Sequence, residues 1–153
     1  MPISALPVET RIPASLLLLL SRIVAGTMFA VSGWNKLFTD DGRDRMLGTL
    51  AEAGIPWPAA SAPAVAMVEW VLGTALVLGV LPRLSAVALM MICAVAAFTD
   101  GIGRIPAGLG PLDWLSWFLY LPEVPLGMVL AWVCVLGAGR YALWTGRAAS
   151  PMA

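Results

Sequence analysis

The chain contains no histidine and only two cysteines. Histidine is the usual axial ligand of b-type haem, the commonest ligand of zinc and copper, and the commonest general base. Cys93 and Cys134 lie far apart in apolar segments and form no Cys-x-x-Cys pair, which argues against a dithiol redox motif and an iron–sulfur cluster. We therefore expect no metal site, no catalytic residue and no redox centre held by histidine or cysteine, and we interpret both thiols as small packed hydrophobic groups.

Charge is also scarce in this chain. Only 12% of its 153 residues are charged, whereas a typical soluble domain has about 25%. Hydrophobic residues make up 60%, so lipid must surround what one small core cannot bury. The formal net charge is zero, which leaves no basic tail to bind nucleic acid. The composition predicts an integral membrane protein in contact with lipid and not with nucleic acid.

Four apolar segments follow one another along the chain. They cover about residues 14–37, 58–80, 84–99 and 112–136. A helix needs roughly 20 apolar residues to cross the hydrocarbon, and the third segment, being shorter, would depend on tilt or on its neighbours. The polar residues 38–57 between the first two segments are interpreted as a connection. We predict an all-α integral membrane four-helix bundle that forms one transmembrane domain over residues 1–153.

Three charged residues lie near the middle of these segments: Arg22 in the first, Glu69 in the second and Glu123 in the fourth. An ionised side chain at the bilayer centre costs about 2.5–3.5 kcal/mol on insertion scales. Because one guanidinium can bridge two carboxylates, we predict that the three meet at one depth as an intramembrane polar cluster. One positive and two negative charges leave an excess of negative charge, so a proton or a polar ligand should complete the cluster.

Small residues share helix faces with these charges. Glycines at such spacing let membrane helices approach closely, which predicts four helix-packing positions: Gly26, Gly33, Gly73 and Gly127. Pro122 and Pro125 flank the glutamate of the fourth segment and predict a kink there, since proline removes a helical donor. Lys36, near the end of the first segment, is interpreted as an anchor that reaches toward the membrane surface.

Three sequence motifs resemble one known family. The stretch SRIVAGTMFAVSGWNKLF, with its arginine, spaced glycines and Gly-x-x-Lys-Leu ending, is similar to the first-helix pattern of the DoxX family. The stretch MVEWVLGTALVLGVLPRLSA resembles its second-helix pattern, and VLGAGRYALW resembles its Gly-x-Gly-Arg close. The resemblance covers about residues 15–145. Members often carry a histidine after the third helix, where this chain has Thr99 and Asp100.

The resemblance implies a four-helix protein of a bacterial or archaeal cytoplasmic membrane. Relatives include a small subunit associated with a thiosulfate:quinone oxidoreductase and a membrane partner of thiol-handling and superoxide-dismutating enzymes. Other protein subunits are therefore expected as partners. Basic residues are divided evenly between the two sides of the predicted bundle, so the positive-inside rule gives no decision, and we favour both termini in the cytoplasm.

Three functions stay open at this point. The first is a non-catalytic or quinone-interacting subunit of an oxidoreductase complex, in which Arg22, Glu69 and Glu123 contact a quinone head group. The second is a structural or assembly scaffold, in which the same charges only set the helix register. The third is a small-molecule or proton carrier, in which they form the pathway.

Overall fold

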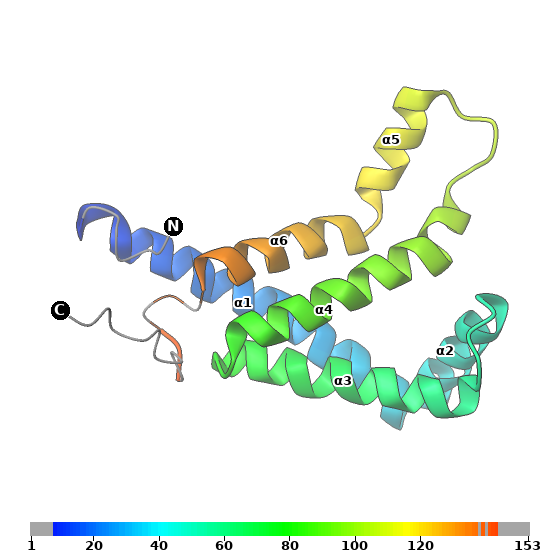
Figure 1. Cartoon of the computed structure of the whole chain (residues 1–153), viewed down its shortest axis with the longest axis horizontal. Helices are drawn as coiled ribbons and strands as arrows, with labels where there is room; N and C mark the ends of the chain where they lie inside the picture. The colour runs from blue at the N-terminus through cyan, green and yellow to red at the C-terminus, as the bar shows by residue number, and fades with distance from the viewer. Residues whose placement is uncertain (1–7, 138, 140, 144–153) are drawn as a thin grey trace.

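The architecture is an all-α bundle, as the sequence predicts. A computed structural model describes residues 8–137, 139 and 141–143, and no strand occurs within those ranges. Helices α1, α3, α4 and α6 run along the bundle, while α2 and α5 lie toward one end (Figure 1). The α-helices are α1 Val8–Phe38, α2 Asp40–Glu52, α3 Pro58–Leu78, α4 Pro82–Ala96, α5 Pro111–Tyr120 and α6 Glu123–Leu136.

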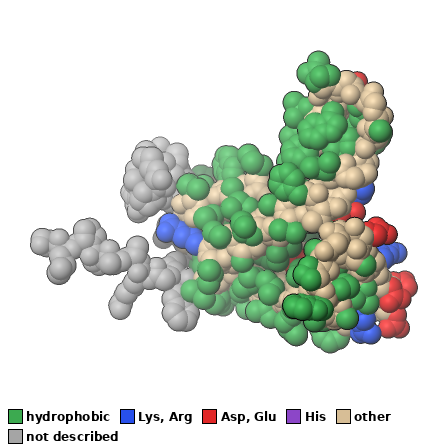
Figure 2. All heavy atoms as spheres, turned by 45° about the vertical axis from the view of Figure 1, so that its right-hand side comes forward, with side chains coloured by type: hydrophobic (Ala, Val, Ile, Leu, Met, Phe, Trp, Pro, Cys, Tyr) green, Lys and Arg blue, Asp and Glu red, His purple; other side chains and the backbone are tan. Residues whose placement is uncertain are grey.

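The membrane-spanning segments follow from helix length and apolarity. Among the described residues, three helical segments are long and apolar enough to cross a bilayer: Pro13–Phe38, Pro58–Leu78 and Pro82–Arg104. A fourth span is possible if the bent pair α5 and α6 counts as one. Hydrophobic side chains cover the flanks of the bundle, and most charged side chains gather toward one end (Figure 2).

The third span is longer than the sequence suggests. Its predicted end near residue 99 is extended by a π-helical turn, Ala97–Gly101, and a 3-10 turn, Ile102–Arg104. The glycines of this stretch indicate a loop when they are read alone. In the structure they continue the helix axis, so the third span reaches the length that a bilayer requires.

The predicted connection over residues 38–57 contains a helix, α2. Thr39 caps it, because its side-chain oxygen accepts a hydrogen bond from the amide of Gly42. Asp40 and Asp41 lie in the first turn, where the positive end of the helix dipole stabilises their negative charge. Its apolar side buries Leu50. A search for apolar segments does not detect this helix, because most of its side chains are polar and face outward.

Close backbone packing joins α1 to α3. A Cβ atom built on Gly33 would lie 2.5 Å from both the carbonyl oxygen of Ala66 and the amide nitrogen of Trp70. A Cβ atom on Gly26 would lie 2.7 Å from the carbonyl oxygen of Gly73. The two antiparallel backbones are therefore nearly in contact, and these three glycines set their register.

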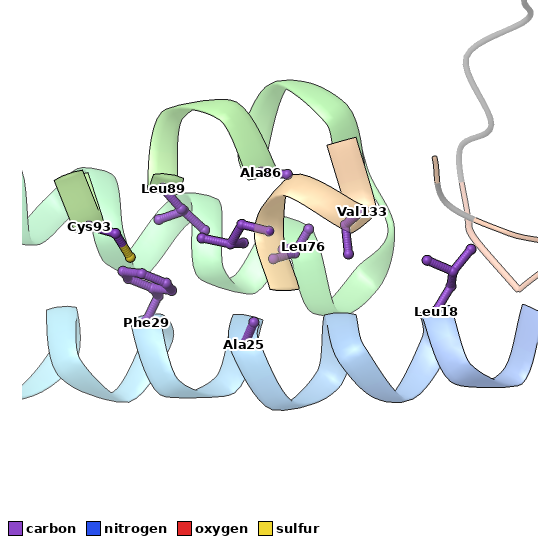
Figure 3. Packing of buried hydrophobic residues seen from close by; sticks show 9 residues of the cluster. Leu18, Ala25, Phe29, Leu76, Ala86, Leu89, Cys93 and Val133 are labelled. Atoms are coloured by element: carbon purple, nitrogen blue, oxygen red, sulfur yellow. The ribbon is translucent and has the colours of Figure 1, made fainter. Parts of the chain in front are cut away.

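The core joins this pair of helices to α4 and α6. Phe29 of α1 lies beside Cys93 of α4, Ala25 of α1 points toward Leu76 of α3, and Leu89 of α4 belongs to the same cluster (Figure 3). Between α4 and α6 the spacing is ordinary, since a Cβ atom on Gly127 would lie 3.9 Å from Cβ of Cys93. Gly127 is thus not required for close approach in the way that Gly33 is.

The kink predicted beside Glu123 is confirmed as a break. Helices α5 and α6 meet at 62°, across Leu121 and Pro122. Leu121 has extended backbone angles, which end α5, and its buried side chain packs into the bundle at the break. Pro125 cannot donate in the first turn of α6, where helical amides lack partners in any case.

The position of α5 can be tested through its polar stripe. At 100° per residue, Asp113, Ser116 and Tyr120 fall on one side of α5, and its leucines and tryptophans occupy the rest. Tyr120 and the apolar residues of α5 are largely solvent-exposed. We predict that α5 lies at headgroup depth with this stripe toward water.

A pair of single-cysteine variants checks this placement. In a Cys93→Ala, Cys134→Ala background reconstituted into vesicles, Ser116→Cys should react with a membrane-impermeant maleimide at least about tenfold faster than Leu115→Cys. The reason is that only the first thiol faces water. Equal rates at the two positions would show that α5 does not lie in the interface.

Candidate functional site

A buried ion pair links α1 to α3. The side chain of Glu69 is only 4% exposed, and Nζ of Lys36 lies 2.8 Å from its Oε1 and 2.7 Å from its Oε2. The hydroxyl of Ser32, one turn earlier on α1, donates to the same Oε2 at 3.1 Å. Lys36 is therefore not the surface anchor that its place near a helix end suggested, because the α1–α3 register puts a carboxylate beside it.

A second ion pair lies between the end of the third span and the start of α6. Nη2 of Arg104 lies 2.7 Å from Oε1 of Glu123 and 3.0 Å from Oδ2 of Asp100. The π-helical and 3-10 turns after α4 carry Arg104 to this position. The glutamate is the first residue of α6, where a negative charge is favoured by the helix dipole.

The third predicted residue, Arg22, lies elsewhere in the bundle. Its side chain is fully buried, and Nη2 donates to the carbonyl oxygen of Tyr141 at 2.7 Å. Its Nη1 lies beside Gly79, which ends α3 with a positive φ of 72°. A side chain there would crowd the guanidinium, since a Cβ atom on Gly79 would lie 3.0 Å from Nη1.

The structure therefore divides the predicted cluster of Arg22, Glu69 and Glu123. Ser32, which contacts Glu69, lies on the same helix as Arg22. The two residues are separated by about 15 Å along the axis of α1 at the helical rise. The prediction of a common depth assumed that the apolar segments align at their midpoints. The glycine contacts between α1 and α3 set a different register and bring Glu69 to the level of Ser32 instead.

The two glutamates line one cavity. It has a volume of about 530 Å³, is partly open, and is bordered by α1, α2, α3, the third span and the first residue of α6. Lys36 and Asp100 also line it, and its apolar wall includes Met91 and Val95. A smaller pocket of about 180 Å³ adjoins it, and it too is lined by Lys36 and both glutamates, with Phe29 and Cys93 among its other lining residues.

The cavity can bind a polar head group on an apolar body. Lys36 offers a third ammonium N–H on its α1 side, beyond the two that contact Glu69, and the two carboxylates offer acceptors. Within the described residues, no group of three or more histidine, cysteine, aspartate or glutamate side chains could hold a metal ion. Both cysteines are free thiols. The arrangement therefore fits recognition of a small molecule by hydrogen bonds in an apolar cleft.

Sequence reasoning did not assign the two cations of this site, Lys36 and Arg104, or Ser32, which donates to Glu69. Lys36 carried a usable signal, because Ser32 and Lys36 are spaced to share one helix face with Gly33 between them. Arg104 carried none, since it stands in a stretch of glycine and proline that is typical of a loop.

Comparison with protein-family models finds a match for this chain. Searches of curated proteins and of solved structures found no significant match. The family model described as DoxX matches residues 17–101, more than half of the chain. The matched part runs from α1 to the π-helical turn and contains Lys36, Glu69 and Asp100, while Arg104 and Glu123 lie beyond it. The chain is an integral membrane protein that belongs to the DoxX family.

Proposed function

We propose that this chain is an accessory membrane subunit that binds a quinone head group in the cavity beside Lys36, Glu69 and Glu123 for a partner oxidoreductase. The observation that carries the proposal is the cavity itself. Its volume of about 530 Å³ falls in the range of small-molecule sites, roughly 300–1,000 Å³. It combines a mostly apolar wall with a few convergent polar groups, which is the usual composition of such sites.

The surroundings of the cavity suit a ligand that arrives from lipid. A shallow groove on α1 is lined by Ile23, Val24, Met28 and Val31, and it shares Ser32 and Asn35 with the cavity. An apolar tail in this groove would leave the ring of the ligand beside the polar groups. Lys36 would donate to a carbonyl oxygen of the ring, since an ammonium group has three donors.

A cavity-filling substitution tests this proposal. Ala96 lines both the cavity and the adjoining pocket, so Ala96→Leu should weaken binding of a decyl-substituted benzoquinone by at least about tenfold, or roughly 1.4 kcal/mol. Binding would be measured with the protein in lipid nanodiscs. The matched control is Ala94→Leu on the exposed face of the same helix, which should bind as the unsubstituted chain does.

The outcomes of this test are separable. Binding that is equal in the unsubstituted chain and both variants would place the ligand outside the cavity. The absence of binding in all three would remove the quinone from the proposal. A pull-down in mild detergent would then identify the proteins and lipids that accompany the chain, which tests the proposed partner oxidoreductase directly.

We also propose that the protein resides in a bacterial or archaeal cytoplasmic membrane with both termini inside. The cavity end of the bundle, which carries α2 and α5, would then face outward. The Ser116→Cys variant tests this orientation, because an impermeant maleimide added to intact cells should label it. Labelling only after the cells are opened would reverse the orientation.

A further inference from the structure

A separate small pocket lies where α2 packs against the end of α1 and the start of α3 (Figure 1). Two basic residues, Lys36 and Arg43, line it, and its volume is about 140 Å³. The other lining residues are apolar: Leu37, Leu47, Ala59, Ala62 and Pro63. At roughly 30 Å³ for each water, this volume equals about four or five waters. The pocket therefore has room for one small polar group of about five heavy atoms.

The guanidinium of Arg43 keeps most of its hydrogen-bond donors for a ligand. Its Nη2 donates to the carbonyl oxygen of Leu37 at 3.0 Å. Its Nη1 lies 3.7 Å from Oδ1 of Asp40, which is too far for a hydrogen bond, and the side chain of that aspartate is 96% exposed. A guanidinium has five N–H groups, and the side chain of Arg43 is 53% exposed, so a ligand can reach it.

The charge around the pocket favours an anion. The carboxylate of Glu69, which pairs with Lys36, lines the neighbouring cavity, so the pocket is bordered by the ammonium group of this pair. The first turn of α3 forms another wall, and the positive end of a helix dipole lies at such a turn. The side chain of its N-cap residue, Trp57, does not cap these amides.

The pocket also lies at the depth of lipid head groups. Lys36 is two residues before the end of the first span, Phe38, and Ala59 is one residue after the start of the second, Pro58. The rings of Trp34 and Phe38, on the last turns of α1, lie 4.2 Å apart between centroids. Aromatic rings gather at the boundary between lipid and water, where the head groups lie. An anion at this depth is most simply a lipid phosphate.

We propose that this pocket binds the phosphate group of a membrane phospholipid. Arg43 donates to the phosphate oxygens in place of its loose contact with Asp40, and the acyl chains stay outside the pocket, against the apolar surface of the bundle. A phosphate group has five heavy atoms, which matches the volume of the pocket. The site lies outside the quinone cavity, so the inference does not depend on the proposed function.

A charge-removing variant tests the role of Arg43. Binding of dioleoyl-phosphatidylglycerol to the full chain in mild detergent would be measured by native mass spectrometry, with dioleoylglycerol as the matched lipid that lacks phosphate. The phospholipid should bind at least about tenfold more tightly than dioleoylglycerol. A basic residue contributes about fivefold in affinity for an anionic lipid, so Arg43→Gln should weaken binding of the phospholipid by about that factor.

Arg45→Gln is the matched control for charge. It makes the same change two residues along α2, but this arginine lines the cavity and not the pocket. It should bind the phospholipid as the unsubstituted chain does. Equal losses in Arg43→Gln and Arg45→Gln would show a general attraction of charge and overturn the inference.

A second pair of variants tests the pocket by its shape. Ala59→Leu places a larger side chain at the wall of the pocket, and it should weaken binding of the phospholipid by at least about fivefold. Ala60→Leu, on the next residue, is the control, since Ala60 is exposed and does not line this pocket. Unchanged binding in both Ala59→Leu and Arg43→Gln would overturn the inference.

A titration with inorganic phosphate identifies the source of the group. The proposal expects inorganic phosphate to bind weakly and the phospholipid to bind tightly, because only the phospholipid adds acyl contacts with the bundle. If inorganic phosphate bound and the phospholipid did not, and if this binding were lost in Arg43→Gln, the pocket would be a site for a soluble phosphate. That result would overturn the assignment to a lipid.

Discussion

Lys36→Met is expected to destabilise the bundle by about 3–5 kcal/mol, because it leaves the carboxylate of Glu69 buried without its positive partner. That carboxylate is 4% exposed and would retain only the hydroxyl of Ser32. Stability would be measured by reversible unfolding in mixed micelles of mild detergent and dodecyl sulfate. The loss is a large fraction of the roughly 5–15 kcal/mol that stabilises a typical folded protein.

The matched comparison removes both charges together. A Lys36→Met, Glu69→Leu double variant should lie within about 1 kcal/mol of the unsubstituted chain, since replacing a buried ion pair by apolar groups is often neutral. If the single and double variants lose stability equally, the two residues are not coupled. The double variant also separates a scaffold from a binding subunit: it should keep the fold and lose the quinone.

Gly33→Ala is expected to cost about 1–3 kcal/mol, because the added methyl group would lie 2.5 Å from backbone atoms of Ala66 and Trp70. These are backbone atoms, so relief requires α1 and α3 to move apart. Gly48→Ala in α2 is the control, since its Cβ atom would meet nothing within 4 Å. That change should stabilise the protein by up to about 1 kcal/mol through helix propensity.

The same unfolding measurement serves both glycine variants. A Gly33→Ala variant as stable as the unsubstituted chain would show that α1 and α3 do not pack in close backbone contact. The movement of α1 away from α3 should also weaken the Lys36–Glu69 pair, which spans the same two helices. The cost of Lys36→Met should therefore be smaller in the Gly33→Ala background than alone.

Features that depend on local sequence were predictable. The lengths of the apolar segments determine the bundle, because lipid demands about 20 apolar residues per crossing helix. Pro122 and Pro125 likewise determine the break before α6, since the loss of a backbone donor acts at the residue itself. The glycines of α1 and α3 were identified for a similar reason, because small residues on one face mark where helices meet.

Features that depend on the register between helices were not predictable in the same way. The sequence predicts that Arg22 meets Glu69, because both lie near the middle of an apolar segment. The backbone contacts of Gly33 set a different register between α1 and α3, in which the two midpoints are not aligned. Lys36 then becomes the partner of Glu69, one turn beyond Ser32. A hydropathy profile predicts the depth of a residue in the bilayer only if the apolar segment is centred there. Tilt and packing against other helices displace the segment from that position.

The division of ion pairs between the two halves of the chain has a consequence for its synthesis on the ribosome. Lys36 and Glu69 both precede the turn between α3 and α4, and Arg104 and Glu123 both follow it. Each half can therefore neutralise its own carboxylate as it enters the membrane, without waiting for the other. Arg22 differs, because its guanidinium donates to the carbonyl oxygen of Tyr141. Tyr141 is synthesised 119 residues later in the chain. Its burial should be one of the last steps of assembly.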